Sequence, residues 1–353
     1  MKAFLMLQDG TRFYGEAFGD VKNTVGEVVF TTAMSGYQAN LCEPSFCGQI
    51  AVLTYPIIGD GGFENYDLDP NRVSVKGVVV KELCESPINW KNRCDIDNFF
   101  KKFGIVGIKN IDTRALTIKL REDGVMNGMI CLEEPTQEQI DALNSYKIEK
   151  PVHHVTTKQV VKYQGKGGKK VAVLDFGVKQ SIVDDLVARG HQVVVYPATT
   201  PASEILACDP DGILLSNGPG DPKECLDIVE NVKQLVGKKP IMGVCVGHNI
   251  LALANGLDTY KLKVGHRGAN QPVKNLATGR TYILSQNHGY AVCEPKDDSV
   301  ASVYFRNVND GTVAGLEYKN AKAFSTAFCP YVLPGPMDTQ YLYDKFEDMM
   351  EGK

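Results

Sequence analysis

The stretch KPIMGVCVGHNILALANG, Lys239–Gly256, shapes the expectations for the second half of the chain. It reads as an apolar strand, a tight turn over Gly243–Gly247, and an apolar helix. This is a cysteine version of the G-x-S-x-G elbow, in which a strained turn between strand and helix pushes a nucleophile into a cleft. Glycines allow close backbone approach, and Cys245 stands at the helix start, where the helix dipole favours a thiolate. The stretch predicts a nucleophilic cysteine, against the alternative of a buried structural thiol.

Apolar strands alternate with helical segments from residue 171 onwards. The strands expected on this pattern are 171–176, 191–196, 212–215 and 240–244, and a helix is expected over 180–189. Such alternation predicts a parallel sheet covered by helices on both faces. Sites in these sheets lie at the carboxyl ends of strands. The glycine-containing loop 214–222 and Cys245 both follow strands, so we expect them at the same edge.

The first 145 residues mix short strands with turns. Asp9-Gly10 predicts a hairpin turn, and helices are expected over 94–103 and 113–122, the second with an N-cap signal at Asp112. The later stretch 160–170 is rich in lysine and glycine and has no apolar period, which is typical of a linker. The predicted organisation is a first domain over 1–147, a linker over 148–169 and a second domain over 170–353.

Bulk properties exclude several function classes. The chain has 353 residues, a formal net charge of −4 and a pI near 5.9, which argue against a nucleic-acid or anionic-membrane surface. No apolar run reaches the ~18 residues of a membrane span, and Gln8-Asp9-Gly10 interrupts the start too early for a signal peptide. The ten cysteines form no C-x-x-C pair. Reduced thiols and a cytoplasmic location are therefore expected.

Several long motifs carry a resemblance to known families. The elbow, the loop 214–222 and the run Ser285–Gly289 resemble a class I glutamine amidotransferase domain. Five further runs resemble the small subunit of carbamoyl-phosphate synthase: Gly26–Phe30, Ser35–Gln38, Leu53–Pro56, Ile111–Thr117 and Gly265–Pro272. The resemblance implies an α/β protein, with a β-rich mixed α/β domain first and a flavodoxin-like amidotransferase domain with a mainly parallel sheet second.

The same resemblance implies a reaction and a partner. In that family the elbow cysteine attacks the side-chain amide of L-glutamine, which gives a thioester and ammonia. The ammonia passes to a large subunit that uses ATP and Mg²⁺ to make carbamoyl phosphate for pyrimidine and arginine biosynthesis. No P-loop, G-x-G-x-x-G or acidic metal cluster occurs here, so no cofactor is expected in this chain itself. His266 has no second ligand at a useful spacing and reads as a structural histidine rather than a metal ligand.

The resemblance also implies a glutamine site. Backbone N–H groups of Gly218 or Gly220 and of Val246 suit a developing oxyanion. Val246 and Asn249 depart from the family elbow, which has Leu and Gln there, and Asn is one methylene shorter than Gln. The residues expected around glutamine are Ser45, Gly218, Gly220, Val246, Asn249, Asn287, Gly289 and Tyr290.

The sharpest departure concerns the catalytic base. The family motif H-P-E-A-S-P-G-P reads CPYVLPGP here, so Cys329 stands at the His position and Tyr331 at the Glu position. Neither a thiol nor a phenol accepts and returns a proton at neutral pH as imidazole does. We therefore expect an impaired glutaminase. Two alternatives stay open: an active glutaminase with His248 or His288 as a rearranged base, and a non-catalytic scaffold for a synthase that uses free ammonia.

Overall fold

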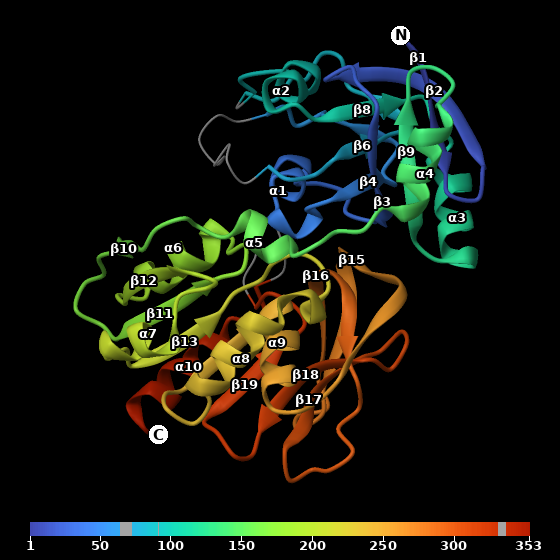
Figure 1. The fold of residues 1–353 in the computed structure, drawn as a ribbon. Helices are drawn as coiled ribbons and strands as arrows, with labels where there is room; N and C mark the ends of the chain where they lie inside the picture. Colours follow the sequence, from blue (N-terminus) through green and yellow to red (C-terminus); the bar gives the residue numbers. More distant parts are fainter. Residues whose placement is uncertain (64–72, 91, 331–336) are drawn as a thin grey trace. The chain divides into compact units, whose positions relative to one another are not determined.

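The structure, a computed structural model, describes residues 1–63, 73–90, 92–330 and 337–353 (Figure 1). The chain divides into two compact units, Met1–Glu149 and Lys150–Lys353, each treated by itself below. Within the described residues, no helix has both the length and the apolar character that crossing a membrane would require.

The first unit is built on a closed seven-stranded barrel. Its strands are β1 (Lys2–Leu7), β2 (Arg12–Gly19), β3 (Thr24–Thr31), β4 (Gln49–Leu53), β6 (Gly77–Val79), β8 (Val106–Lys109) and β9 (Met126–Cys131). They follow the order β1-β2-β8-β6-β4-β3-β9. The predicted hairpin is confirmed, since β1 and β2 pair antiparallel with Leu5 opposite Phe13. β3, β4, β6 and β8 are parallel neighbours, so the predicted β-rich mixed character is confirmed, whereas closure of the barrel was not predicted.

The remaining elements of the first unit are short, and most cover the barrel. They are α1 (Tyr37–Leu41), η1 (Pro44–Phe46), β5 (Ile57–Ile58), β7 (Glu82–Leu83), α2 (Ile96–Phe103), α3 (Thr113–Asp123) and α4 (Gln137–Ser145). The two predicted helices are confirmed, and so is the predicted N-cap of the second at Asp112; the cap of the first at Asp95 was not predicted. The Asp95 carboxylate accepts from the Asn98 N–H at 2.8 Å, and the Asp112 carboxylate accepts from the Ala115 N–H at 2.9 Å.

The second unit is built on a ten-stranded sheet of order β10-β12-β11-β13-β14-β19-β18-β16-β15-β17. Its strands are β10 (Val161–Tyr163), β11 (Lys170–Asp175), β12 (Gln192–Pro197), β13 (Gly212–Leu215), β14 (Ile241–Val244), β15 (Thr259–Asn275), β16 (Thr281–Val292), β17 (Ala301–Asn307), β18 (Val313–Tyr318) and β19 (Ala323–Thr326). β12, β11, β13, β14 and β19 run parallel, as predicted for the centre of the sheet. The strands on either side of them pair antiparallel, which the predicted mainly parallel sheet does not include.

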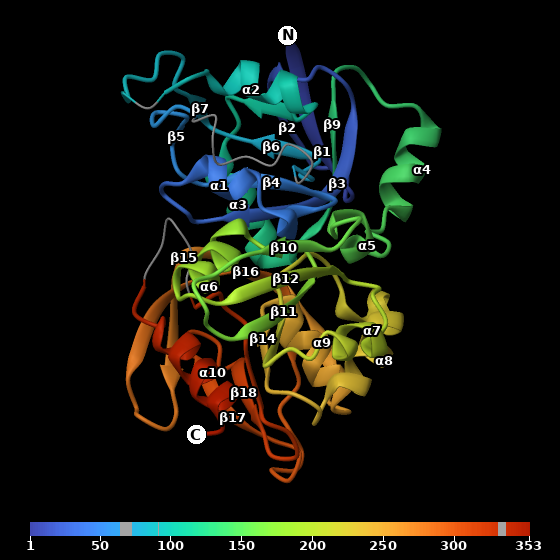
Figure 2. The same ribbon diagram turned by 90° about the vertical axis from the view of Figure 1, so that its left-hand side faces the viewer.

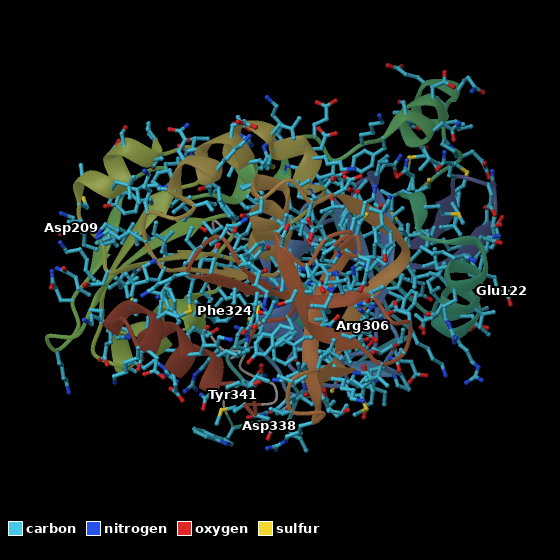
Figure 3. All side chains as sticks on the ribbon, turned by 90° about the horizontal axis from the view of Figure 1, so that it is seen from below. Glu122, Asp209, Arg306, Phe324, Asp338 and Tyr341 are labelled. Carbon is cyan, nitrogen blue, oxygen red and sulfur yellow. The ribbon has the colours of Figure 1, made fainter. Side chains whose placement is uncertain are left out.

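Helices cover both faces of this sheet, as predicted (Figure 2). The helical elements are α5 (Pro151–Val155), α6 (Gln180–Ala188), α7 (Ala202–Ala207), η3 (Pro222–Cys225), α8 (Leu226–Leu235), α9 (Val246–Ala254) and α10 (Tyr341–Glu351). Alternate residues of β11 face opposite sides. Leu174 packs in the cluster that holds α7, α8 and α9, whereas Val173 packs with α6 and α10. Phe324 of β19, labelled in Figure 3, belongs to the second cluster.

The segment 148–169, predicted as a linker, contains two elements of the structure. These are α5 and β10. β10 is only three residues long, and it is fixed by antiparallel pairing of Val161–Tyr163 with β12. Three residues are too few to show an alternation of apolar and polar side chains. The sequence pattern therefore indicated an irregular segment, and only the pairing with β12 defines the strand.

Close packing of α9 on β13 depends on Gly247. Its N–H donates to the Ser216 carbonyl at 3.1 Å, and a Cβ atom at this position would lie 2.3 Å from the Leu215 carbonyl oxygen. This carbonyl oxygen belongs to the backbone of β13 and cannot rotate away from an added methyl group. Any side chain therefore has to push the elbow off the sheet.

We expect Gly247→Ala to destabilise the protein by about 1–3 kcal/mol, because its added methyl group overlaps the backbone of β13. The urea unfolding midpoint of the full chain measures this change. Gly61→Ala is the matched control, since a Cβ there meets nothing within 4 Å. Equal midpoints for both variants would contradict the packing described here.

Candidate active site

Cys245 occupies the predicted elbow between β14 and α9. Its backbone has φ 54° and ψ −113°, and it is one of four non-glycine residues with positive φ in the described chain. Non-glycine residues held this way cost of order 1–3 kcal/mol and cluster at functional sites. The Cys245 N–H donates to the Thr326 carbonyl at 2.8 Å, which fixes the turn against β19. The strained geometry predicted from the sequence is thus confirmed.

The loop that follows β13 lies against the elbow. A Cβ on Gly218 would meet the Phe176 carbonyl at 2.0 Å and the Val246 Cγ1 at 3.0 Å, so Gly218 and Val246 are neighbours. Asn217 fastens this loop, because its Nδ2 donates to the Gly177 carbonyl at 2.9 Å and its Oδ1 accepts from the Lys179 N–H at 3.1 Å. Two of the predicted oxyanion residues are therefore brought together.

Gly220, the third predicted oxyanion residue, lies at the far end of the same loop. It has φ 82°, and a Cβ there would lie 2.0 Å from the Pro151 Cγ of α5. Only glycine fits this backbone conformation and this gap without strain.

Strand β16 brings amide groups to the elbow. The Cys245 thiol donates to the Asn287 carbonyl at 3.6 Å, and the Asn249 Nδ2 donates to the Tyr290 carbonyl at 3.4 Å. The Asn249 Oδ1 and both side-chain polar atoms of Asn287 are buried without a hydrogen-bond partner in the described part of the chain. Buried amides of this kind are costly unless a ligand or water pairs with them. The predicted residues Asn249 and Asn287 thus bring buried amide atoms without a described partner close to Cys245, and the Tyr290 carbonyl accepts from one of these amides.

Gly289 and Ser45 complete the predicted set. Gly289 lies between Asn287 and Tyr290 on β16, and a Cβ there would lie 3.1 Å from Nη2 of Arg267. Ser45 belongs to the first unit, in η1, where its hydroxyl donates to the buried carboxylate of Glu43 at 2.9 Å. In the second unit, Val246 and Asn287 therefore lie directly beside Cys245, and Gly218 and Asn249 lie next to them, whereas Gly220 lies against Pro151 and Ser45 is described in its own unit.

Cys329 lies three residues beyond the end of β19. Its side chain is 9% exposed and belongs to the same buried apolar cluster as that of Cys245. Thr326, whose carbonyl binds the Cys245 N–H, begins the segment that leads to Cys329. Tyr331, the residue at the predicted Glu position, lies outside the described residues.

Neither nearby histidine is prepared to take a proton. His248 is fully buried, its Nδ1 lies 2.7 Å from the Ser325 Oγ, and burial lowers its pKa to about 3. Burial, together with neighbouring His266, lowers the pKa of His288 well below its usual value. The His288 ring nitrogens contact the Tyr290 carbonyl at 2.9 Å and the Gln286 side chain at 3.1 Å, both within its own strand.

His266 is held by a carboxylate rather than by a metal-like cluster. Its Nε2 lies 2.7 Å from the Asp310 carboxylate, and its ring meets the edge of His288 at 5.1 Å. Burial raises the pKa of Asp310, but the hydrogen bonds to His266 and Thr312, together with the charge interaction with His266, outweigh burial and lower that pKa to about 2. Over the residues that the structure describes, no group of three or more His, Cys, Asp or Glu side chains has the arrangement of a metal site.

Two site residues escaped sequence reasoning. Gln286 is 4% exposed, and its Nε2 is buried without a partner in the described chain. Ser325 is fully buried and connects His248 with the Tyr318 hydroxyl, 3.1 Å away. The available signal was a polar residue inside an otherwise apolar strand, as Ser325 is in AFST, but that signal alone does not name a site.

The comparisons with known proteins agree across the whole chain. The family model described as carbamoyl-phosphate synthase small chain, CPSase domain, matches residues 5–130, and that described as glutamine amidotransferase class-I matches residues 172–349. A carbamoyl phosphate synthase small chain of Listeria monocytogenes is 46% identical, covering 100% of this chain and 98% of the relative. One of Clostridium acetobutylicum is 44% identical, covering 99% and 100%. A Bacillus subtilis pyrimidine-specific small chain is 42% identical, covering 99% and 96%.

The low pKa of His248 predicts a loss of stability in mild acid. The unfolded chain binds a proton at this residue near pH 6.5, whereas the folded chain does so only near pH 3. Stability is therefore greatest above pH 6.5 and falls as the pH drops from there, by up to about 1.4 kcal/mol per pH unit for each such histidine. His288 contributes in the same direction. Urea unfolding at pH 7.5, 6.0 and 5.0 measures the slope.

The matched variants separate His248 from the rest of the protein. His248→Asn keeps a polar partner for Ser325 but cannot titrate, so the slope between pH 6.5 and 5.0 decreases. His154→Asn removes an exposed histidine and leaves the slope unchanged. The same slope in His248→Asn as in the unmodified chain would contradict the assignment.

Proposed function

Because the chain belongs to the carbamoyl-phosphate synthase small-chain family, we propose that it is the glutamine-binding chain of such a synthase, with a strongly reduced ability to release ammonia from glutamine. Its partner is a large chain that carries the ATP and Mg²⁺ chemistry. Two features together carry the proposal. The elbow at Cys245 is intact, and a buried thiol, Cys329, stands at the sequence position where the resemblance places the catalytic histidine.

The binding part of the proposal rests on the groups that face the elbow. A glutamine side chain ends in an amide, which both donates and accepts hydrogen bonds. The buried polar atoms of Asn249 and Asn287 offer both kinds of partner beside Cys245. Gly218 and Val246 adjoin each other at the elbow, where backbone N–H groups suit an oxyanion formed from the amide carbonyl.

The reduced rate follows from the proton that the reaction has to move. Attack by the Cys245 sulfur requires the thiol proton to leave, and the departing amine requires a proton to arrive. The Cys245 thiol donates a hydrogen bond to the Asn287 carbonyl. A backbone carbonyl is too weak a base to remove the proton from the thiol. A thiol at position 329 ordinarily has a pKa near 8.5 and serves poorly as a proton carrier at neutral pH. Loss of a triad member typically costs factors of about 10⁴.

A rearranged base is disfavoured by the surroundings of the two candidate histidines. His248 has a pKa near 3, and its Nδ1 is engaged by Ser325. His288 is half-buried, and both of its ring nitrogens contact groups of its own strand. A base works best when its pKa lies near the operating pH, and burial has moved both histidines far below it.

The test uses the chain with its large partner. We expect the complex to make carbamoyl phosphate from ammonia far better than from glutamine, because ammonia needs no Cys245 chemistry. Glutamine turnover by the chain alone, and by the complex, should stay near background. Isothermal titration with glutamine measures binding separately from turnover. A kcat of about 1 per second or more with glutamine would contradict the reduced rate, and recovery of the two chains as separate species on sizing would contradict the partnership.

Restoring the missing groups should restore turnover. We expect Cys329→His combined with Tyr331→Glu to raise glutamine turnover at least about 100-fold, since a general base contributes about 10²–10⁴. Cys329→Ala with Tyr331→Glu is the control without imidazole and should stay at background. Adding Cys245→Ser to the restored variant should abolish the gain. If the restored variant folds but stays inactive, Asn249→Gln added to it tests whether the shorter amide is the remaining obstacle.

A further inference from the structure

We propose that Cys245 and Cys329 form a reversible disulfide that closes the Cys245 site under oxidising conditions. The pairing concerns redox control of the site and goes beyond binding and turnover of glutamine. No disulfide joins any of the ten cysteines in the structure.

The first argument is the shared anchoring of the two residues. The Cys245 N–H donates to the Thr326 carbonyl at 2.8 Å, and Cys329 follows Thr326 by three residues. The Thr326 hydroxyl donates to the Phe328 carbonyl at 2.8 Å, and the Ala327 N–H donates to the Ala314 carbonyl at 2.9 Å. These bonds hold the segment before Cys329 beside the end of β14. A disulfide requires Cα atoms within about 7 Å of each other. Cys329 lies only three positions beyond Thr326, the residue that binds the Cys245 backbone.

The second argument is the environment of the two sulfur atoms. Cys245 and Cys329 belong to one buried apolar cluster, together with Val244 and Phe328. Their exposed fractions are 5% and 9%, so each residue is shielded but keeps a small solvent-exposed area. Beyond Cys329, the Pro330 carbonyl accepts from the Thr339 hydroxyl at 3.0 Å, which limits movement of the segment away from the site.

The third argument is selectivity among the ten thiols. Cys245 stands at the N-terminus of α9, a position that favours the thiolate, and the thiolate is the reactive form. Burial raises the pKa of Cys42 and Cys225 to about 12 and that of Cys131 to about 11. Cys131 and Cys225 are also completely enclosed. These three stay protonated at neutral pH and react slowly.

The oxidant is a low-molecular-weight disulfide, such as oxidised glutathione. The Cys245 thiolate attacks one of its sulfur atoms, which forms a mixed disulfide and releases one thiolate. The Cys329 sulfur, after losing its proton to solvent, then attacks the Cys245 sulfur and releases the second thiolate. Two electrons pass from the protein to the oxidant, and one protein disulfide replaces one small-molecule disulfide. A reducing thiol reverses both steps.

The expected consequence is a closed site. The bridge occupies the Cys245 sulfur and ties the segment after β19 to the elbow. Binding of a ligand to this site then requires prior reduction.

The test is mass-spectrometric mapping of the full chain. The reduced protein is equilibrated with oxidised glutathione at neutral pH, alkylated and digested without reductant. We expect one dominant linked peptide pair, joining the Cys245 and Cys329 peptides, and its loss after dithiothreitol. Cys208→Ser is the matched control, because it removes an exposed thiol and should leave the linked pair in place. In Cys329→Ser, Cys245 should stop at the mixed disulfide.

Recovery of Cys245 and Cys329 on separate peptides, alkylated or carrying glutathione, in the unmodified chain would overturn the proposal. Cys329→Ala replaces Cys329→Ser if the serine variant loses its circular dichroism spectrum. Glutamine binding by the reduced protein is measured in parallel. Its absence contradicts the proposed function, whereas the mapped bridge alone decides the disulfide.

Discussion

The parallel pairing of β14 with β19 is the constraint on which the site depends. Ile241–Val244 pairs in register with Ala323–Thr326, and the bond from the Cys245 N–H to the Thr326 carbonyl extends the ladder by one residue. On its other side β14 pairs with β13, so the loop that carries Gly218 ends at the same edge. One set of backbone hydrogen bonds therefore positions Cys245, the loop that carries Gly218 and the segment that leads to Cys329.

The strained backbone of Cys245 persists because its surroundings determine it from several directions. α9 is buried at eight of its nine positions, and Gly247 bonds to the backbone of Ser216. His248 adds a buried chain of contacts through Ser325 to Tyr318. These contacts offset a cost of about 1–3 kcal/mol at the elbow. A cysteine that only filled the core would not require a left-handed backbone, so the geometry favours a residue that presents its sulfur to a ligand.

Sequence reasoning succeeded where local rules act and fell short where distant pairing acts. The central parallel strands, the capped helices α2 and α3, and the elbow each follow from periodicity or from a short motif. The antiparallel half of the second sheet does not. β15 contains glycines, a proline and many charges, and its pairing with β16 shifts register between Lys261 and His266. Closure of the barrel likewise depends on β9 meeting both β1 and β3, far apart along the chain.

At the site, the sequence predicted which residues lie near Cys245 better than it predicted their burial and hydrogen-bond partners. Cys245, Asn249 and Asn287 come together as predicted, but only the structure shows which of their polar atoms are left unmatched. Burial of His248 and His288 could not be read from their positions next to the motifs, because burial depends on which strands and helices cover them. That burial bears directly on the choice between an impaired site and a rearranged base.

Recognition and proton transfer place different demands on the same cleft. Recognition needs donors and acceptors held in place, and the buried amides of Asn249 and Asn287 are held by the elbow and by β16. Proton transfer needs one group of suitable pKa within reach, and the proposed function rests on a thiol, Cys329, standing at the position where the resemblance places that group. Each unmatched buried polar group costs about 1–3 kcal/mol. Apolar side chains of similar size would remove that cost if nothing were bound there. The amides around Cys245 therefore favour a polar ligand or ordered water that pairs with them.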